Sequence, residues 1–265
     1  MTAGTLIKVK GEMVGLDIGS RSIELVVLDN GELVHRAMLP TTFDPLKQCR
    51  RILQGVSIPG IVATGYGRRL FSENSAGQHI QTITEIQAYA LGAANMFPQA
   101  RTVLDIGGQD TKAISLGPGG KVFSFEMNDR CAAGTGKFLE YMATALQIPL
   151  DEFGHFALKG DRKVPIGSMC TVFAETEATS LMARGERPEN IALGLHAAIV
   201  QRTLKMLGRV GLESPLVFAG GVAHNPCMTK LIQEHNDIQV LIPEDPDYTG
   251  ALGAALWGMH KKPCA

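Results

Sequence analysis

The chain has 265 residues, enough for two domains of ordinary size that each bury their own core. Its net charge of -1 gives no basic face, so nucleic acid is not an expected partner. No apolar run approaches the length of a membrane span, and the first residues lack the apolar core of a signal peptide. We therefore expect a cytoplasmic protein, where disulfides are rare, and the odd number of five cysteines agrees with this.

The first hundred residues predict strands followed by helices. Residues 1–12 are interpreted as a frayed lead-in. Two strands are expected within residues 13–28. Further strands are expected at 32–39, after the turn Asn30-Gly31, and at 61–64. Helices are expected at 45–53 and at 84–96, the second ending before Pro98. The crossing between two domains is placed at 98–101.

The remaining chain continues the alternation of strands and helices. Strands are expected at 104–116, which folds around a glycine bend, at 122–125, at 216–222 and at 240–242. One helix is expected to begin near Ala132 or Gly136 and to end at Leu146. Others are expected at 149–159, 172–183, 189–210, 225–234 and 249–259. The last is rich enough in alanine and glycine to pack closely on another element. This alternation predicts α/β architecture.

Two segments share one plan. Leu16-Asp17-Ile18-Gly19 and Leu104-Asp105-Ile106-Gly107 each continue with a small residue, a polar bend and a second apolar strand. Two copies of one unit indicate two similar domains. Glycines at each bend let the backbone approach an anion, although any β-hairpin also favours Gly and Asp there. A carboxylate at the end of a buried strand is costly unless it binds a metal or a water.

Two cysteines stand where helices are expected to begin. The positive end of a helix dipole at Cys131 and at Cys170 suits a negatively charged group. A cubane iron–sulfur cluster needs four thiolates, so two per chain complete it only across a two-fold axis between two subunits. The alternative is that both are buried apolar cysteines. Cys49, Cys227 and Cys264 have no such setting and are expected to be ordinary.

Longer motifs carry a family resemblance. They are Thr64-Gly-Tyr-Gly-Arg68, Asp105-Ile-Gly-Gly-Gln-Asp-Thr-Lys112, Met127-Asn-Asp-Arg-Cys-Ala-Ala-Gly-Thr-Gly-Lys137, Cys170-Thr-Val-Phe-Ala-Glu-Thr-Glu177, Phe218-Ala-Gly-Gly-Val222 and Tyr248-Thr-Gly-Ala-Leu-Gly-Ala-Ala255. With the two hairpins, they resemble the nucleotide-binding superfamily of actin, hexokinase and the heat-shock chaperones. Within it the chain is similar to the activators of 2-hydroxyacyl-CoA dehydratases and the ATPase subunits of benzoyl-CoA reductase. The likeness covers nearly the whole chain.

The resemblance implies a fold of two similar ribonuclease-H-like domains with a nucleotide cleft between them. The first would comprise residues 11–98 and 249–262, and the second 99–248. It also implies an ATP-hydrolysing electron donor of anaerobic metabolism that passes single low-potential electrons to a partner enzyme. That acceptor would be a 2-hydroxyacyl-CoA dehydratase, an aromatic acyl-CoA reductase or a double-cubane cluster protein. A homodimer would hold one 4Fe-4S cluster through Cys131 and Cys170, with reduced ferredoxin or flavodoxin as the donor.

Residue roles follow from the same resemblance and from the chemistry of phosphoryl transfer. Asp17 and Asp105 would hold Mg²⁺ through water, and Gln109 would orient the attacking water, with Glu85 as the alternative. Phosphate contacts are expected from Gly19, Ser20, Arg21, Ser22, Gly107, Gly108, Gln109, Gly134 and Lys137. Contacts to the nucleoside are expected from Gly220, Gly221 and Asn225, with His224 as a candidate for stacking. The chain departs from the family at Arg21 and Glu24, where the family has Thr or Ser and Lys.

Two other functions fit the hairpins alone. A sugar or small-molecule kinase of the same superfamily would also need an aspartate that binds the acceptor in a cleft, and the sequence singles out none. A regulator without enzymatic activity would bind only nucleotide and a partner.

Overall fold

The computed structural model describes residues 9–57, 59–75, 80–167, 170–235 and 238–261, and the chain forms two compact units. Unit 1 takes the residues up to Pro98, the short excursion Pro118–Val122 and the residues from Asp247 onward. Unit 2 takes Gln99–Gly117 and Phe123–Pro246. Among the described residues no helix is both long and apolar enough to cross a membrane.

Unit 1 is built on a five-stranded sheet with the order β4-β3-β2-β6-β7. Its strands are β2 (Met13–Ile18), β3 (Ser22–Asp29), β4 (Glu32–Pro40), β6 (Ile61–Thr64) and β7 (Ile80–Thr82). Its helices are α1 (Pro45–Ile52), α2 (Arg68–Glu73), α3 (Glu85–Met96) and α9 (Thr249–Lys261). Side chains alternate between the two faces of a strand, so Leu16 and Leu25 pack toward α1 and α2, while Met13 and Val26 pack toward α3 and α9.

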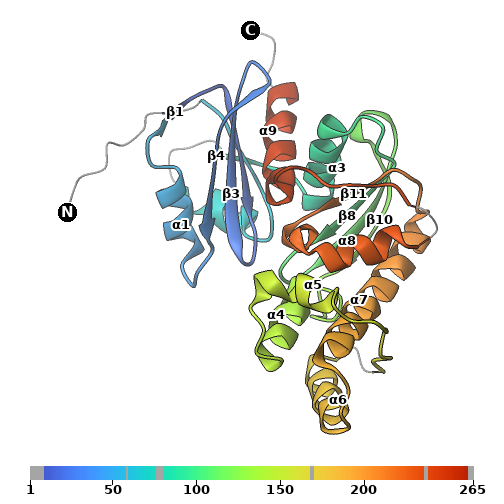
Figure 1. Ribbon diagram of the computed structural model, residues 1–265. Coiled ribbons are helices and arrows are strands. Elements are labelled where there is room, and N and C mark those ends of the chain that lie inside the picture. The colour runs from blue at the N-terminus through green and yellow to red at the C-terminus, as the bar shows by residue number, and fades with distance from the viewer. Residues whose placement is uncertain (1–8, 58, 76–79, 168–169, 236–237, 262–265) are drawn as a thin grey trace. The chain divides into compact units, whose positions relative to one another are not determined.

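The backbone of helix α9 packs directly against the backbones of β2 and α3. A Cβ atom added to Gly15 of β2 would lie 1.8 Å from the carbonyl oxygen of Ala251, and one added to Gly253 would lie 1.7 Å from that of Ala88. Only glycine fits at such crossings. Figure 1 shows α9 and α3 side by side along this sheet. The prediction that the last helix packs closely on another element is confirmed.

A second, two-stranded sheet corrects part of the predicted lead-in. β1 (Val9–Lys10) pairs in parallel with β5 (Val56–Ser57), and the backbone N–H of Val9 donates a hydrogen bond to the carbonyl of Gly55. Residues 1–8 lie outside the described part of the chain. The sequence also gave no sign of α2 or β7, which are short and follow the glycine-rich turn after β6.

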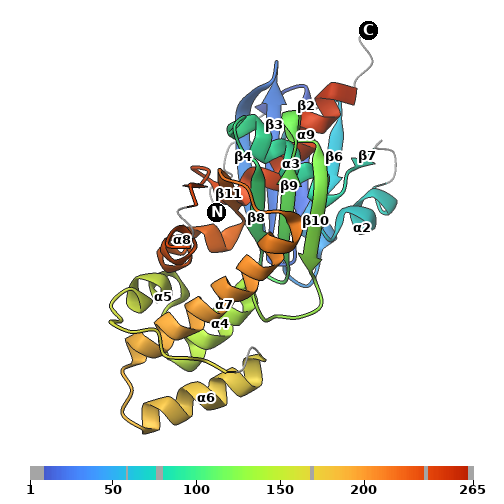
Figure 2. The same cartoon turned by 90° about the vertical axis from the view of Figure 1, so that its right-hand side faces the viewer.

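Unit 2 is built on a second five-stranded sheet with the order β10-β9-β8-β11-β12. Its strands are β8 (Thr102–Ile106), β9 (Thr111–Leu116), β10 (Val122–Asn128), β11 (Leu216–Ala219) and β12 (Val240–Leu241). Its helices are α4 (Gly136–Ala145), α5 (Leu150–Ala157), α6 (Thr171–Ala183), α7 (Pro188–Val210) and α8 (Pro226–Gln233). Figure 2 shows that α6 lies at the end of α7 that is far from the sheet.

The described residues also form three short 3-10 helices, η1 (Pro118–Gly120), η2 (Gly221–His224) and η3 (Pro246–Tyr248). The core of unit 2 gathers large side chains from the sheet and its helices, among them Leu104, Phe138, Phe153, Ile191 and Phe218. It is one continuous cluster, so the hairpin after β8 is fixed to a rigid base.

The two sheets share one topology. In unit 1, β2 pairs antiparallel with β3 and parallel with β6, which pairs parallel with β7. In unit 2, β8 pairs antiparallel with β9 and parallel with β11, which pairs parallel with β12. The strands therefore correspond one to one, and the prediction of two similar α/β domains is confirmed.

Candidate functional site

The first hairpin joins β2 to β3 in unit 1. The N–H of Gly19 donates to the carbonyl of Ser22 over 3.0 Å, which closes the bend. The hydroxyl of Thr41 donates to the carbonyl of Gly19 over 2.7 Å and holds the bend from the end of β4. Arg21 is exposed at the tip. The hairpin is thus a fixed loop whose tip faces solvent.

Two glycines enclose the carboxylate of Asp17 at the end of β2. Gly65 has a φ of +85°, and a Cβ there would lie 2.4 Å from Oδ1 of Asp17. A Cβ at Gly250, in the first turn of α9, would lie 2.1 Å from Oδ2. Both close approaches require glycine, so the position of this carboxylate is set by backbone on two sides.

Glu24 lies opposite Asp17 on β3, and both side chains are buried. Burial raises the pKa of Glu24 well above its ordinary value, and the nearby charge of Asp17 adds to the increase. Unit 1 therefore has two buried carboxyl groups at the position where the family resemblance expects a lysine beside the aspartate.

The second hairpin joins β8 to β9 in unit 2 and closes like the first, with the N–H of Gly107 donating to the carbonyl of Asp110 over 3.0 Å. The first N–H groups of α4 hold it. Gly136 donates to the carbonyl of Gly107 over 2.9 Å, and Lys137 to that of Gly108 over 2.8 Å. These N–H groups were expected to be available to an anion. That expectation is wrong, because the hairpin carbonyls already accept from them.

Asp105, at the end of β8, is fully buried beside Lys112. Nζ of Lys112 lies 2.8 Å from Oδ2 of Asp105 and 2.8 Å from Oδ2 of Asp110. A buried carboxylate was expected to need a metal or a water. Here a buried ammonium group balances its charge, which the sequence analysis missed.

The turn after β11 repeats the arrangement at Gly65. Gly220 has a φ of +79°, and a Cβ there would lie 2.2 Å from Oδ1 of Asp105. Since Thr64 and Ala219 pair with the two aspartates in register, Gly65 and Gly220 are equivalent positions. Each unit therefore places one glycine backbone against the aspartate that precedes its hairpin.

Asn225 has a structural role in the turn that follows. Its Oδ1 accepts from the N–H groups of Cys227 and Met228 over 3.0 and 3.1 Å, which caps α8. Its Nδ2 lies 3.0 Å from Nε2 of His196. Nδ1 of His196 lies 2.7 Å from the carbonyl of Ala192, so Nδ1 is the protonated nitrogen and Nε2 accepts from Asn225. Burial lowers the pKa of His196 to about 4. The contact of Asn225 with a nucleoside stays a prediction.

Cys131 is exposed in the loop between β10 and α4. Nδ2 of Asn128 donates to the carbonyls of Cys131 and Ala133 over 2.9 and 3.1 Å, which holds the loop in place. Gly134, at a φ of +90°, and the hydrogen bond from Thr135 to Ala132 prevent α4 from extending backward. The helix begins at Gly136, one of the two predicted starts, so Cys131 lies in the loop before α4 and not at the helix start as predicted.

Cys170 is exposed and is the N-cap residue of α6. Exposure of both cysteines overturns the alternative that they are buried apolar residues. Cys49 and Cys227 are buried, and burial raises the pKa of each thiol to about 12. A thiol with so high a pKa is a poor metal ligand, because the thiolate is the ligating form. Cys264 lies outside the described residues.

The remaining predicted residues occupy different surroundings. Gln109 and His224 are exposed, while Glu85 is mostly covered and lies 3.5 Å from Nη1 of Arg68. Nζ of Lys137 lies 3.1 Å from the carboxylate of Glu140. The carbonyl of Gly134 accepts from the hydroxyl of Thr111 over 2.7 Å. Ser20 and Gly108 are partly exposed, and Gly221 is exposed.

No group of three or more His, Cys, Asp or Glu side chains that could hold a metal ion is found in the part of the chain that the structure describes. A site with two thiols from each chain is compatible with this result, because half of its ligands come from a second copy. The donor set fits a thiolate-bound cluster shared between two chains.

Comparison with known proteins gives one family. Residues 14–258 match the model of the BadF/BadG/BcrA/BcrD ATPase family. The activator of lactoyl-CoA dehydratase of Anaerotignum propionicum is 38% identical over 92% of this chain and 96% of its own length. The structure of the Acidaminococcus fermentans (R)-2-hydroxyglutaryl-CoA dehydratase component A is 32% identical, with a TM-score of 0.86 over 94% of this chain and 98% of that one.

The activator of the 2-hydroxyisocaproyl-CoA dehydratase from Clostridium difficile, solved with bound ADPNP, is 34% identical. Its TM-score is 0.84, and the match covers 94% of each chain. A ROK family glucokinase from Streptomyces griseus, 15% identical with a TM-score of 0.61, shares the fold alone. The ribonuclease-H-like superfamily fold expected from the two hairpins is confirmed.

Proposed function

The chain belongs to the BadF/BadG/BcrA/BcrD ATPase family, and we propose that it hydrolyses ATP to deliver single low-potential electrons to an acceptor enzyme. One observation carries this proposal. Cys131 and Cys170 are exposed, whereas Cys49 and Cys227 are buried with thiol pKa values of about 12. The pair therefore stands apart from the other described cysteines as candidate ligands.

Cys131 and Cys170 would supply two of the four thiolates of a 4Fe-4S cluster, and the same pair of a second copy would supply the others. The functional form is then a homodimer. When bound, such a cluster transfers one electron at a time at a potential set by its surroundings. Asn128 holds the Cys131 loop through two backbone carbonyls, and the first turn of α6 positions Cys170.

The hairpins at Gly19–Ser22 and Gly107–Gln109 would contact the phosphates of ATP through backbone N–H groups at their tips. Asp17 and Asp105 would bind water molecules of a hydrated Mg²⁺, since that ion keeps much of its hydration. Lys112 holds Asp105 in place through their ion pair. Gln109, which is exposed at the tip of the second hairpin, would orient the attacking water. Gly220 and Gly221 would receive the nucleoside.

The partners follow from the chemistry and from the names of the relatives. Two of these relatives are named as activators of acyl-CoA dehydratases, so a 2-hydroxyacyl-CoA dehydratase is the first acceptor to test. An aromatic acyl-CoA reductase and a double-cubane cluster protein are the further acceptors. Reduced ferredoxin or flavodoxin would be the donor, and we place the protein in the cytoplasm.

The test is the iron content of protein purified without oxygen. We expect about four iron atoms per two chains, as one cubane requires. Cys131→Ala and Cys170→Ala should each abolish iron binding and weaken the dimer, while Cys49→Ala should retain both. Full iron content in either of the first two variants contradicts the proposed ligands.

ATP hydrolysis is tested separately. Gln109→Ala should lower kcat for hydrolysis by about 100-fold, the range found when one positioned polar group is removed from an active site. It should leave iron content and dimer unchanged, because the side chain of Gln109 is exposed and the hydrogen bonds between the hairpin and the start of α4 use backbone atoms of other residues. An unchanged kcat would remove Gln109 from the mechanism.

A further inference from the structure

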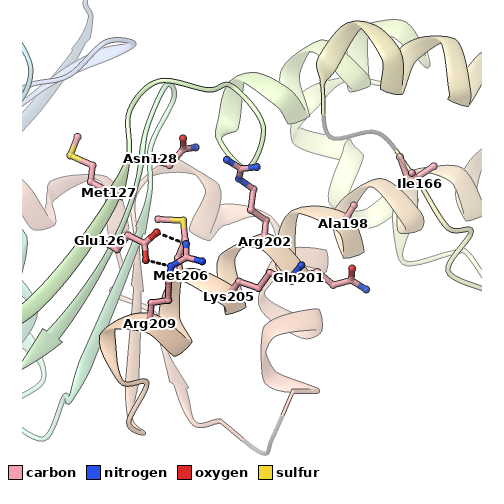
Figure 3. Close-up of a pocket in the computed structure, with 11 residues that line it drawn as sticks. Glu126, Met127, Asn128, Ile166, Ala198, Gln201, Arg202, Lys205, Met206 and Arg209 are labelled. Atoms are coloured by element: carbon pink, nitrogen blue, oxygen red, sulfur yellow. Dashed lines mark hydrogen bonds and ion pairs between the residues drawn. The ribbon is translucent and has the colours of Figure 1, made fainter.

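Unit 2 contains a pocket of about 550 Å³ that neither the hairpins nor the cysteines use. It lies between the end of β10, one face of α7 and the residues Ile166 and Gly167 (Figure 3). Its polar lining includes Glu126, Asn128, Gln201, Arg202, Lys205 and Arg209. The volume lies within the range of pockets that bind small molecules.

The charge of this pocket is positive. Arg209 and Glu126 form an ion pair, drawn as dashed lines in Figure 3, and so balance each other. Arg202 and Lys205 make no ion pair with any residue in the described ranges. They are three residues apart on α7 and lie on the same helix face. Two positive charges therefore line one pocket, and neither has an ion-pair partner in the described part of the chain.

The walls of the pocket are held in place. Asn128, at the end of β10, donates to the backbone of the Cys131 loop. The N–H of Gly167 donates to both carboxylate oxygens of Glu177 on α6, over 2.9 and 3.0 Å. A Cβ at Gly134 would lie 3.1 Å from Cδ of Arg202, so the stem of Arg202 passes close to that loop. In Figure 3 its guanidinium extends toward the loop after β10.

The lining selects a class of ligand. A guanidinium group binds a carboxylate or a phosphate through two parallel hydrogen bonds, and the ammonium of Lys205 adds a second positive charge nearby. Met127, Ile166 and Met206 line the same pocket and offer contact to a carbon skeleton. A monovalent anion would leave one of the two cations unbalanced.

We propose that this pocket binds a small organic anion with two acidic groups, either phosphates or carboxylates. The site goes beyond the proposed ATPase and electron-transfer function and does not rest on it. A ligand there would touch the segments that precede Cys131 and Cys170. It would therefore restrict the approach of other molecules to the two thiols.

The test is calorimetric titration of the full chain at low ionic strength, because exposed charges are screened by salt. The probes are pyrophosphate, citrate and, as a monovalent comparison, acetate. We expect pyrophosphate or citrate to bind once per chain at this site and acetate to bind at least tenfold more weakly. Whether pyrophosphate or citrate binds more tightly identifies the acidic group of the natural ligand.

The double variant Arg202→Gln/Lys205→Gln should weaken that binding at least tenfold. The control Lys159→Gln removes one exposed positive charge elsewhere in unit 2 and should change nothing. Comparison with the double variant also separates this site from any phosphate binding at the hairpins, which the variant retains. Equal affinity in the wild type and the double variant, or no binding of either multivalent probe, overturns the proposal.

A second readout is the rate of alkylation of Cys131 and Cys170 in protein without iron. The bound probe should slow alkylation severalfold in the wild type and leave it unchanged in the double variant. Unchanged rates in the wild type with the pocket saturated would contradict the placement of the ligand between the two segments.

Discussion

Nζ of Lys112 lies 2.8 Å from Oδ2 of Asp105, and the two buried residues face each other across the strand pair β8–β9. The equivalent positions in unit 1 are Asp17 and Glu24 on β2 and β3. The chain therefore builds the same hairpin twice, once with a buried ion pair and once with two buried carboxyl groups. The first two predictions concern this difference.

Replacing Lys112 by methionine should destabilise the protein by about 3–5 kcal/mol, because Asp105 would stay buried without its balancing charge. Chemical denaturation at pH 7 measures this. Lys137→Met is the matched control, since its side chain is 54% exposed and pairs with Glu140. It should cost less than about 1 kcal/mol. Similar losses in the two variants would contradict the importance of the buried pair.

Glu24→Gln should make the free energy of unfolding less dependent on pH than it is in the wild type, and the variant should gain stability relative to the wild type as the pH rises. The pKa of Glu24 is raised in the folded state, mainly by burial and then by Asp17, so folding favours its protonated form. That contribution is complete below the ordinary pKa of about 4.5 and is lost as the pH rises through the folded pKa. The free energy of unfolding, measured from pH 5 to pH 8 with a chelator present, should therefore fall more steeply in the wild type than in Glu24→Gln. Glu32→Gln, on an exposed side chain, should follow the wild type.

Alanine at Gly65 or Gly220 should be much more harmful than alanine at Gly185. All three glycines have a φ near +80°, which costs an L-residue about 1–2 kcal/mol. At Gly185 the new Cβ meets no atom within 4 Å, so that cost stands alone. At Gly65 and Gly220 it also meets an aspartate carboxylate at 2.4 and 2.2 Å. We expect at least about 2 kcal/mol of additional loss from this overpacking, measured by urea denaturation. Equal losses at the three positions would contradict the overpacking expected at Gly65 and Gly220.

His196 should make the protein sensitive to acid. Its pKa falls to about 4 in the folded state, so its contribution to stability is present above the ordinary value of 6.5 and is lost as the pH falls toward 4. The gap corresponds to about 3 kcal/mol of unfolding free energy. His196→Gln should flatten the stability profile between pH 6.5 and pH 4. A profile as steep as that of the wild type would assign the acid sensitivity to other groups.

Most of the fold follows from sequence patterns that report on the backbone. The repeated Leu-Asp-Ile-Gly segments, the apolar strand before Gly220 and the long periodic helix over Pro188–Val210 all lie where those patterns predict. Short elements such as α2 escape prediction because six residues contain too few turns to show a period. Two starts were predicted for α4, because the alanines at 132 and 133 favour helix, and Gly136 is the correct one, since Gly134 takes a left-handed conformation.

Side-chain pairings were harder to predict. Lys112 is the last residue of the motif that begins at Asp105. The two residues pair in register across the hairpin, so the strand register would have predicted that they lie opposite each other. The amide of Asn225 caps α8 and contacts His196, a residue about thirty positions away in sequence, and neither contact was predicted. Pairs brought together by long-range folding leave no local pattern. The pocket at Arg202 and Lys205 is hidden for the same reason, because its walls come from three separate segments.

The glycine crossings of α9 have a consequence for synthesis on the ribosome. One face of the sheet in unit 1 is covered by helix α9, which is translated after all of unit 2. The nascent chain therefore exposes Met13, Val26 and their neighbours on that face until residues 249–261 emerge. Unit 2 is complete at Pro246, just before that helix is translated, and can fold first. Chaperones that bind exposed apolar segments should consequently bind the amino-terminal unit of the nascent chain for most of its translation.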